Sequence, residues 1–267
     1  MNNETCGNLF LKPLWWARGV KRFAARLLDR SKTRSPQYLL SQCVTSAEGQ
    51  VVQIGSNDGE TNDPIRQLLL SRRQWRALFV EPVPYLFERL TNNYPCDSRF
   101  VFANVAVSDE KTAAFYWVDA CAKQHLRDLP PWFDQLGSFQ RDHITKHLNG
   151  ILEPFIVSAT VRCTTLSELL ADHAIRQVDI LHIDTEGHDW KVLAQLDLTA
   201  CVPDVILYEH RHLSHADKQS SLRFLEGEYD LYDLGRDYFA IAKAARSIRR
   251  DAVSVVAKQR VTPLTVR

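Results

Sequence analysis

The chain has 267 residues, of which 45% are hydrophobic and 24% are charged, and its formal net charge at pH 7 is +1. This length allows one large α/β domain, and the near-zero charge indicates no nucleic-acid partner. Six scattered cysteines without zinc-type spacing, and the lack of an apolar run of membrane-span length, predict a cytoplasmic protein in a reducing compartment.

Residues 1–35 differ in composition from the rest of the chain. Basic residues alternate here with apolar ones, and Val20, Phe23 and Leu27 recur at helical spacing. We predict a basic amphipathic helix as an N-terminal extension. Two interpretations stay open for it: the helix contacts an anionic membrane surface, or it packs on the domain's own sheet or at a dimer contact.

Residues 36–245 form the predicted main domain, in which strands and helices alternate. Core strands are expected at residues 51–54, 78–81, 100–107, 178–183 and 205–208. Helix starts are expected at Asp63-Pro64, Pro84, Thr165 and Ser214. This alternation predicts a parallel sheet with helices on both faces, and residues 229–234 and 238–242 predict a closing antiparallel pair.

The alternation is interrupted after the third core strand. Residues 112–118 predict an extra strand, and residues 119–156 form an irregular insertion that contains His125, His143 and His147. Long insertions of this kind commonly form lids or binding loops, so we interpret residues 119–156 as a substrate lid, with a plain surface elaboration as the alternative. Residues 246–267 are predicted to form a basic C-terminal tail.

The turn after the first core strand has the spacing of a nucleotide site. Gly55 and Gly59 permit close backbone approach, and Glu81 follows about 22 residues later, where nucleotide-binding units place the acid that binds ribose hydroxyls. The third glycine of the dinucleotide fingerprint and the Gly-Lys-Ser/Thr of a phosphate loop are missing. A nucleoside without a pyrophosphate is therefore favoured, and an ordinary strand-to-helix turn is the alternative.

Polar residues follow each predicted core strand, at the edge of a parallel sheet where ligands bind. They are Asn57 and Asp58, Glu81, Ser108 and Asp109, Asp184 with Thr185 and Glu186, and Glu209 with His210, Arg211 and His212. One such carboxylate could simply cap the next helix. Five such strand ends in register favour a ligand site.

Five segments occur in a characteristic order: Val-Gln-Ile-Gly-Ser-Asn-Asp-Gly (52–59), Phe-Val-Glu-Pro (79–82), Val-Ala-Val-Ser-Asp (105–109), Thr-Thr-Leu-Ser-Glu-Leu-Leu (164–170) and Val-Asp-Ile-Leu-His-Ile-Asp-Thr-Glu-Gly-His-Asp (178–189). Together they resemble the FkbM-type S-adenosylmethionine-dependent methyltransferases. The resemblance covers about residues 50–242. It implies the Rossmann-like class I methyltransferase fold, a mostly parallel seven-stranded α/β sheet with helices on both faces and an antiparallel last strand.

The resemblance also implies a cofactor site. The implied cofactor-binding residues are Gly55, Asn57 and Gly59 at the methionine and ribose, Glu81 at the ribose hydroxyls, Ser108 and Asp109 at the adenine, and Asp184 at the transferred methyl group. Glu186 and His188 would lie just beyond Asp184. Gln53 stands where many methyltransferases carry an acid, so Asp58 or Asp184 would have to supply the charge near the cofactor's amino group.

We predict an O-methyltransferase for a hydroxyl of a small molecule or sugar-containing glycoconjugate, the sugar being implied by the resemblance alone. The candidate catalytic residues are Asp184, Glu186, His188, Glu209 and His210, because carboxylates and histidines are the usual bases near neutral pH. A nicotinamide-dependent oxidoreductase and a non-catalytic binding or scaffold module are the alternatives. No metal ligands are predicted, although Asp184, Glu186, Glu209 and a histidine could hold a divalent ion such as Mg²⁺.

Overall fold

The computed structural model describes residues 35–245 and Ile248. The predicted amphipathic helix of residues 1–35 and the predicted tail of residues 246–267 fall, apart from Ser35 and Ile248, outside these residues. Within the described range, no helix has both the length and the apolar character needed to cross a membrane.

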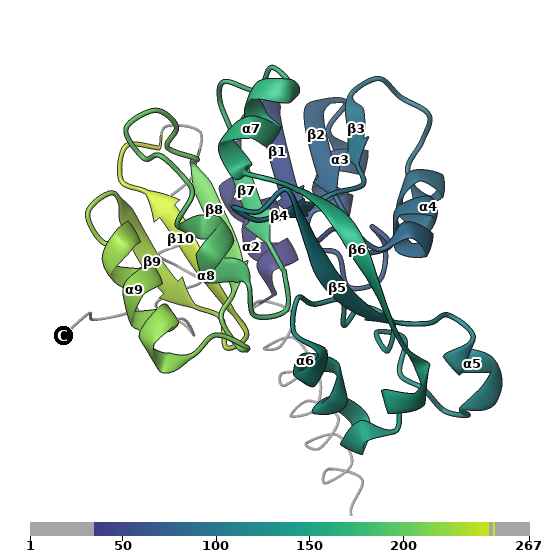
Figure 1. The fold of residues 1–267 in the computed structure, drawn as a ribbon. Helices are drawn as coiled ribbons and strands as arrows, with labels where there is room; N and C mark the ends of the chain where they lie inside the picture. The colour runs from purple at the N-terminus through teal and green to yellow at the C-terminus, as the bar shows by residue number, and fades with distance from the viewer. Residues whose placement is uncertain (1–34, 246–247, 249–267) are drawn as a thin grey trace, which may run out of the picture.

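A seven-stranded sheet forms the centre of the described chain, with the strand order β3-β2-β1-β7-β8-β10-β9 (Figure 1). Its strands are β1 (Glu48–Ile54), β2 (Gln74–Val80), β3 (Phe100–Ala103), β7 (Ile180–Ile183), β8 (Val205–Glu209), β9 (Tyr229–Asp233) and β10 (Asp237–Ala242). The strands from β3 to β8 pair in parallel, whereas β10 runs antiparallel to both β8 and β9. The predicted fold class is therefore confirmed, including the antiparallel last strand.

Helices cover both faces of this sheet because its strands are apolar on both sides. The helices α2 (Pro36–Cys43), α3 (Arg66–Ser71) and α4 (Pro84–Asn93) pack on one face, and α7 (Leu166–Asp172), α8 (Asp189–Leu193) and α9 (His215–Leu225) pack on the other. Successive strand residues point to opposite faces. Val51 thus joins the first group of helices, and its neighbour Val52 joins the second.

The helix starts predicted at Thr165 and Ser214 are confirmed by their capping contacts, and α4 begins at the predicted Pro84 without a side-chain cap. Thr165 forms a capping box with Glu168, and the Ser214 side chain accepts a hydrogen bond from the Asp217 backbone N–H. Asp63 Oδ1 accepts from the backbone N–H groups of Ile65 and Arg66, at 2.7 and 3.1 Å. The helix α3 nevertheless begins at Arg66, a little later than the Asp63-Pro64 signal indicated.

The expected strand at residues 100–107 is wrong as a single element. It breaks after Ala103, and β4 (Ala106–Val107) belongs to a second sheet with β6 (Ile156–Thr164) and β5 (Thr112–Val118), which has the order β4-β6-β5 in the described chain. Asn104 explains the break, because its side-chain amide donates to the carbonyls of Glu81 and Pro82, at 2.7 and 3.2 Å. These bonds fix the chain at the end of β2 and direct it away from the main sheet.

The insertion has its own small core. It contains α5 (Ala122–His125), α6 (Arg141–Thr145) and the 3₁₀ helices η1 (His147–Gly150) and η2 (Glu153–Phe155), at the far end of β5 and β6 in Figure 1. The buried residues of this core are Val118, Ala122, Phe133, Leu136, Ile144 and Leu152. The insertion is joined to the main domain by an ion pair between Arg89 and Asp134 at 2.7 Å, and by a hydrogen bond from the Gln135 side chain to the Thr61 carbonyl at 3.2 Å.

Candidate active site

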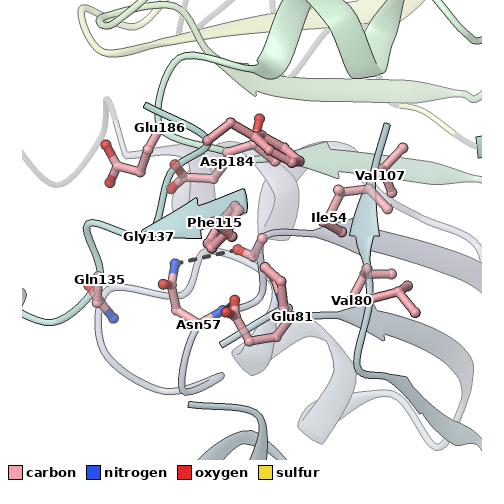
Figure 2. Close-up of a pocket in the computed structure, with 16 residues that line it drawn as sticks. Ile54, Asn57, Val80, Glu81, Val107, Phe115, Gln135, Gly137, Asp184 and Glu186 are labelled. Atoms are coloured by element: carbon pink, nitrogen blue, oxygen red, sulfur yellow. Dashed lines mark hydrogen bonds between the residues drawn. The ribbon is translucent and has the colours of Figure 1, made fainter. Parts of the chain in front are cut away.

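A cavity lies at the carboxyl ends of β1, β2 and β7, beneath the insertion (Figure 2). It encloses about 450 Å³, part of which is open to solvent. Figure 2 shows Asp184 and Glu186 on one side of this cavity and Asn57 and Glu81 on the other. We call it the cofactor cavity.

Gly55 brings the loops after β1 and β7 into contact. It has a φ of +80°, and a Cβ added to it would lie only 1.8 Å from the carbonyl oxygen of Asp184. A side chain at this position would therefore separate the two loops, which both line the cavity. Gly59 also has a positive φ, of +68°, but its Cβ would meet Leu90 of α4, at 2.5 Å. Gly59 thus serves helix packing and does not line the cofactor cavity.

Glu81 is buried at the end of β2, with 3% of its surface exposed. Its Oε2 accepts a hydrogen bond from the Asn57 backbone N–H and its Oε1 from that of Val83, both at 2.8 Å. Desolvation outweighs these bonds and raises the pKa of Glu81 to about 7. Each carboxylate oxygen can accept a second hydrogen bond, so Glu81 remains able to bind hydroxyls in the cavity.

Asp184 lines the cofactor cavity and also a second cavity, which encloses about 1,530 Å³ of largely open space. His182 and Glu209 line the second cavity with it. Burial, together with the negative charges of Glu209 and Glu186, raises the pKa of Asp184 well above its usual value. Burial and the charge of Glu186 likewise raise the pKa of Glu209 to about 9. These carboxyl groups therefore hold protons near neutral pH, or else attract a cation.

Two predicted cofactor residues, Gln53 in β1 and Asp58 in the turn after it, lie outside both cavities. Asp58 closes its own turn, because its side chain accepts hydrogen bonds from the backbone N–H groups of Glu60 and Thr61, at 3.0 and 2.8 Å. Gln53 is 2% exposed, and its Oε1 has no hydrogen-bond partner among the described residues. Neither residue is brought to the lining of the cofactor cavity.

The segment after β3, which includes β4, reaches the cavity with apolar residues. Val105, Ala106 and Val107 line it, and Ser108 and Asp109 do not. The Ser108 backbone N–H instead donates to the Thr164 carbonyl, at 3.0 Å, which continues the pairing of β4 with β6. An adenine ring could pack on this apolar wall without contacting either of the two predicted polar residues.

Of the predicted catalytic residues, the structure brings Asp184, Glu186 and Glu209 together. His188 packs on the ring of Phe139, with 4.4 Å between ring centroids, and burial lowers its pKa to about 4. His210 stacks on Tyr238 at 3.7 Å. Neither histidine lines the cofactor cavity or the second cavity.

Several site residues were not assigned from the sequence. Phe115, Gln135, Gly137 and Phe139 line the cofactor cavity from β5 and the insertion. His143 and His147 lie close to Glu186 and His212. These two histidines have the spacing H-x-x-x-H, a common pattern of metal ligands, and this signal could have located them.

Comparison with solved structures finds matches at low similarity. Human methyltransferase-like protein 13 in complex with SAH has 11% sequence identity and a TM-score of 0.39, over 87% of this chain and 88% of that chain. The Methanococcus jannaschii fibrillarin pre-rRNA processing protein has 10% identity and a TM-score of 0.37, over 76% and 70%. A search of curated proteins finds no match.

The match to a family model is much more extensive. The model of the methyltransferase FkbM domain aligns with residues 53–238, well over half of the chain, and this range contains every residue that lines the cofactor cavity. The family predicted from the sequence motifs is thereby confirmed, and the chain belongs to the FkbM family of S-adenosylmethionine-dependent methyltransferases.

Proposed function

We propose that the protein is an O-methyltransferase whose acceptor is a hydroxyl of a small molecule or of a sugar-containing compound. One observation carries the proposal: Asp184 lines both the cofactor cavity and the second cavity. A group at this junction can contact the cofactor from one side and the acceptor from the other. We therefore assign the second cavity to the acceptor.

The residues of the cofactor cavity fit S-adenosylmethionine. Glu81 can bind the ribose hydroxyls, and the apolar wall of Val105–Val107 and Phe115 can cover the adenine. Asp184 and Glu186 supply negative charge near a sulfonium, which would also offset the raised pKa of Asp184. When bound, S-adenosylmethionine supplies a methyl group that is transferred by in-line displacement. The protein contributes by holding the acceptor oxygen in line.

A hydroxyl acceptor must also lose a proton, and the site contains groups suited to this. Asp184 and Glu209 both line the acceptor cavity, and the pKa of each is raised. A general base must be ionised before it can accept a proton, and the positive charge of a bound sulfonium would lower the raised pKa of Asp184 toward the working pH. We assign proton acceptance to Asp184, because it alone of the two also lines the cofactor cavity.

The acceptor cavity has a lining that suits hydroxylated molecules. Side chains that can hydrogen-bond hydroxyls are plentiful, and they include Asn62, Asp63, Arg66, Arg236 and Asp237. Trp132 of the insertion adds a half-buried indole on which the apolar face of a sugar ring can pack. These features support the acceptor class without identifying one acceptor.

The test is to identify the atom that receives the methyl group. The purified full chain would be incubated with ¹³C-methyl S-adenosylmethionine and a panel of sugars, phenols, alcohols, amines and thiols. The ¹³C chemical shift of each product separates O-methyl from N-methyl and S-methyl groups. We expect O-methyl products that are lost in Asp184→Asn and kept in the exposed control Asp109→Asn. Methyl groups on nitrogen or sulfur, or undiminished transfer by Asp184→Asn, would contradict the proposal.

A further inference from the structure

Five potential ligand residues from three separate segments meet beside the cofactor cavity. His143 and His147 come from the insertion, Glu186 follows β7, and Glu209 and His212 come from the end of β8. The candidate ligand atoms of the three histidines all lie within 4.8 Å of one another, and so do those of Glu186, Glu209 and His212. His212 belongs to both sets, so the two sets form one cluster. We call these five residues the His–Glu cluster.

The distances in the His–Glu cluster agree with those between ligands of one metal ion. His143 Nε2 lies 2.8 Å from Glu186 Oε2, and His212 Nε2 lies 3.6 Å from Glu186 Oε2 and 3.8 Å from Glu209 Oε2. Neighbouring ligands with bonds of about 2.1 Å are separated by about 3.0 Å in an octahedral site and about 3.4 Å in a tetrahedral one. A site that uses all five residues would have to be larger than tetrahedral, and the pairs at 3.6 and 3.8 Å would have to move closer together.

Three polar atoms of the cluster are buried without a hydrogen bond. They are His143 Nε2, Glu186 Oε2 and Glu209 Oε2, and within the described residues none has a hydrogen-bond partner. His143 Nε2 and Glu186 Oε2 lie 2.8 Å apart, which is an ion pair when His143 is protonated, but the two groups are not aligned as a hydrogen bond. A buried polar atom left in this state costs about 1–3 kcal/mol. A cation bound by all three atoms would remove that cost.

His147 is held in the tautomer that a metal ligand needs. Its Nδ1 lies 2.8 Å from the backbone carbonyl oxygen of His143. A carbonyl oxygen can only accept, so Nδ1 must carry the proton and Nε2 keeps its lone pair. A ligating histidine almost always donates its other ring N–H in this way. The ring of His147 is also close to that of His212, with 5.4 Å between centroids, in an edge-on arrangement.

The ligand types indicate which metals the cluster would bind. Imidazole nitrogens suit zinc and the other late first-row divalent ions, whereas Mg²⁺ and Ca²⁺ prefer sites made of oxygen ligands. Three histidines with one or two carboxylates are a typical donor set for Zn²⁺. Mg²⁺, which the sequence left as an alternative, is a poor match for this cluster.

We propose that His143, His147, His212 and Glu186, together with Glu209, form a binding site for one divalent transition-metal ion of the Zn²⁺ class. Glu186 also lines the cofactor cavity and Glu209 the acceptor cavity, so the ion would lie between the two. Its role at this place rests on the proposed function. The ion would bind the acceptor oxygen and lower the pKa of its hydroxyl, so that less basic strength is required of Asp184.

The proposal is tested by metal binding to the full chain. The protein would be stripped with dipicolinate, dialysed, and titrated with ZnCl₂ in a calorimeter, and Co²⁺ would serve as a spectroscopic probe of ligand geometry. We expect one Zn²⁺ per chain and visible Co²⁺ absorption bands. His147→Gln and His212→Gln should each weaken Zn²⁺ binding at least about tenfold. His125→Gln, an exposed histidine of the same insertion, is the matched control and should bind like wild type.

Titration of the same samples with S-adenosylhomocysteine separates this proposal from the proposed function. Equal S-adenosylhomocysteine binding by wild type and both variants would show that the variants are folded. A folded wild type that binds no stoichiometric Zn²⁺, or binds it as tightly after both substitutions, would overturn the metal site. Zn²⁺ binding lost in the variants, in a protein that binds no S-adenosylhomocysteine, would support the metal site and contradict the proposed function.

Discussion

Glu186 Oε2 lies 2.8 Å from His143 Nε2 and so connects the loop after β7 to the helix α6 of the insertion. A second contact reinforces the connection, because the Ser138 hydroxyl lies 3.4 Å from the Glu186 carbonyl oxygen. Glu186 also lines the cofactor cavity. The arrangement of the insertion and the shape of the cofactor cavity therefore depend on the same residue.

Removal of metal is expected to stop methyl transfer but to spare cofactor binding. The proposed ion contacts the acceptor oxygen, whereas the ribose and adenine are assigned to Glu81 and Val105–Val107. Product formation and S-adenosylhomocysteine affinity would be measured in the stripped protein, and again after Zn²⁺ or Mg²⁺ is added. Transfer should return with Zn²⁺ and not with Mg²⁺. Full activity in the stripped protein would contradict the proposed role of the ion.

Gly55→Ala should abolish cofactor binding as well as lower stability. Its Cβ would overlap the Asp184 carbonyl oxygen, and its φ is +80°. Gly235 is a matched control, because its φ is +96° but its Cβ would meet nothing within 4 Å. Gly235→Ala should cost only the left-handed penalty of about 1–2 kcal/mol and bind S-adenosylhomocysteine normally. Similar stability losses and equal binding in the two variants would show that the approach of the two loops is unimportant.

Glu81 should make stability depend on pH in a defined window. Its pKa in the folded protein is about 7, above its ordinary 4.5. Folding therefore favours the neutral form of Glu81. The contribution of this carboxyl group to the free energy of unfolding is fully present below pH 4.5 and is lost as pH rises through 7. Glu81→Gln cannot titrate. The free energy of unfolding of wild type, relative to Glu81→Gln, should therefore fall by on the order of 3 kcal/mol between pH 4.5 and 8.

Urea unfolding of wild type and Glu81→Gln without cofactor, at several pH values, measures the difference between their free energies of unfolding. Ionisable groups that the two proteins share cancel in this comparison. Glu88→Gln, at an exposed position of α4, provides the control and should differ from wild type by a constant amount. A difference between wild type and Glu81→Gln that does not change with pH would show that the carboxyl group has no raised pKa in the folded protein.

Asp184→Asn should lower the rate of methyl transfer by about 10²- to 10⁴-fold, the usual contribution of a general base. Its affinity for S-adenosylhomocysteine, which has no sulfonium, should change far less. Asp237→Asn is the comparison, because Asp237 lines the acceptor cavity and not the cofactor cavity. That substitution should raise KM for the acceptor more than it lowers kcat. Initial-rate kinetics of the two variants would distinguish these effects, and equal losses of kcat would argue against Asp184 as the base.

The sequence predicted the main sheet well because its signals are local. Apolar runs such as Val51–Ile54, followed by glycine turns and capping residues, specify strands and helices without reference to distant parts of the chain. The break after Ala103 could not be found in this way. It depends on hydrogen bonds from Asn104 to the carbonyls of Glu81 and Pro82, which lie more than 20 residues away.

The site was predicted in part, for a related reason. Glu81, Asp184 and Glu186 follow core strands directly, so strand order alone places them at one edge of the sheet. No comparable rule places the side chains of the insertion. His143 reaches Glu186 only because the insertion packs against the loop after β7. His188 and His210 follow strands too, but their rings pack on Phe139 and Tyr238. Position after a strand therefore indicates the edge of the sheet and not the direction of the side chain.

The most direct test of the account is calorimetric titration of the protein with S-adenosylhomocysteine, with NADH as the competing class of ligand. Wild type, Glu81→Gln and the control Glu88→Gln would be compared under the same conditions. We predict saturable binding of one S-adenosylhomocysteine per chain by wild type and Glu88→Gln, strongly weakened binding by Glu81→Gln, and no binding of NADH. Binding of NADH without S-adenosylhomocysteine, or unchanged affinity in Glu81→Gln, would contradict the assignment of the cofactor cavity.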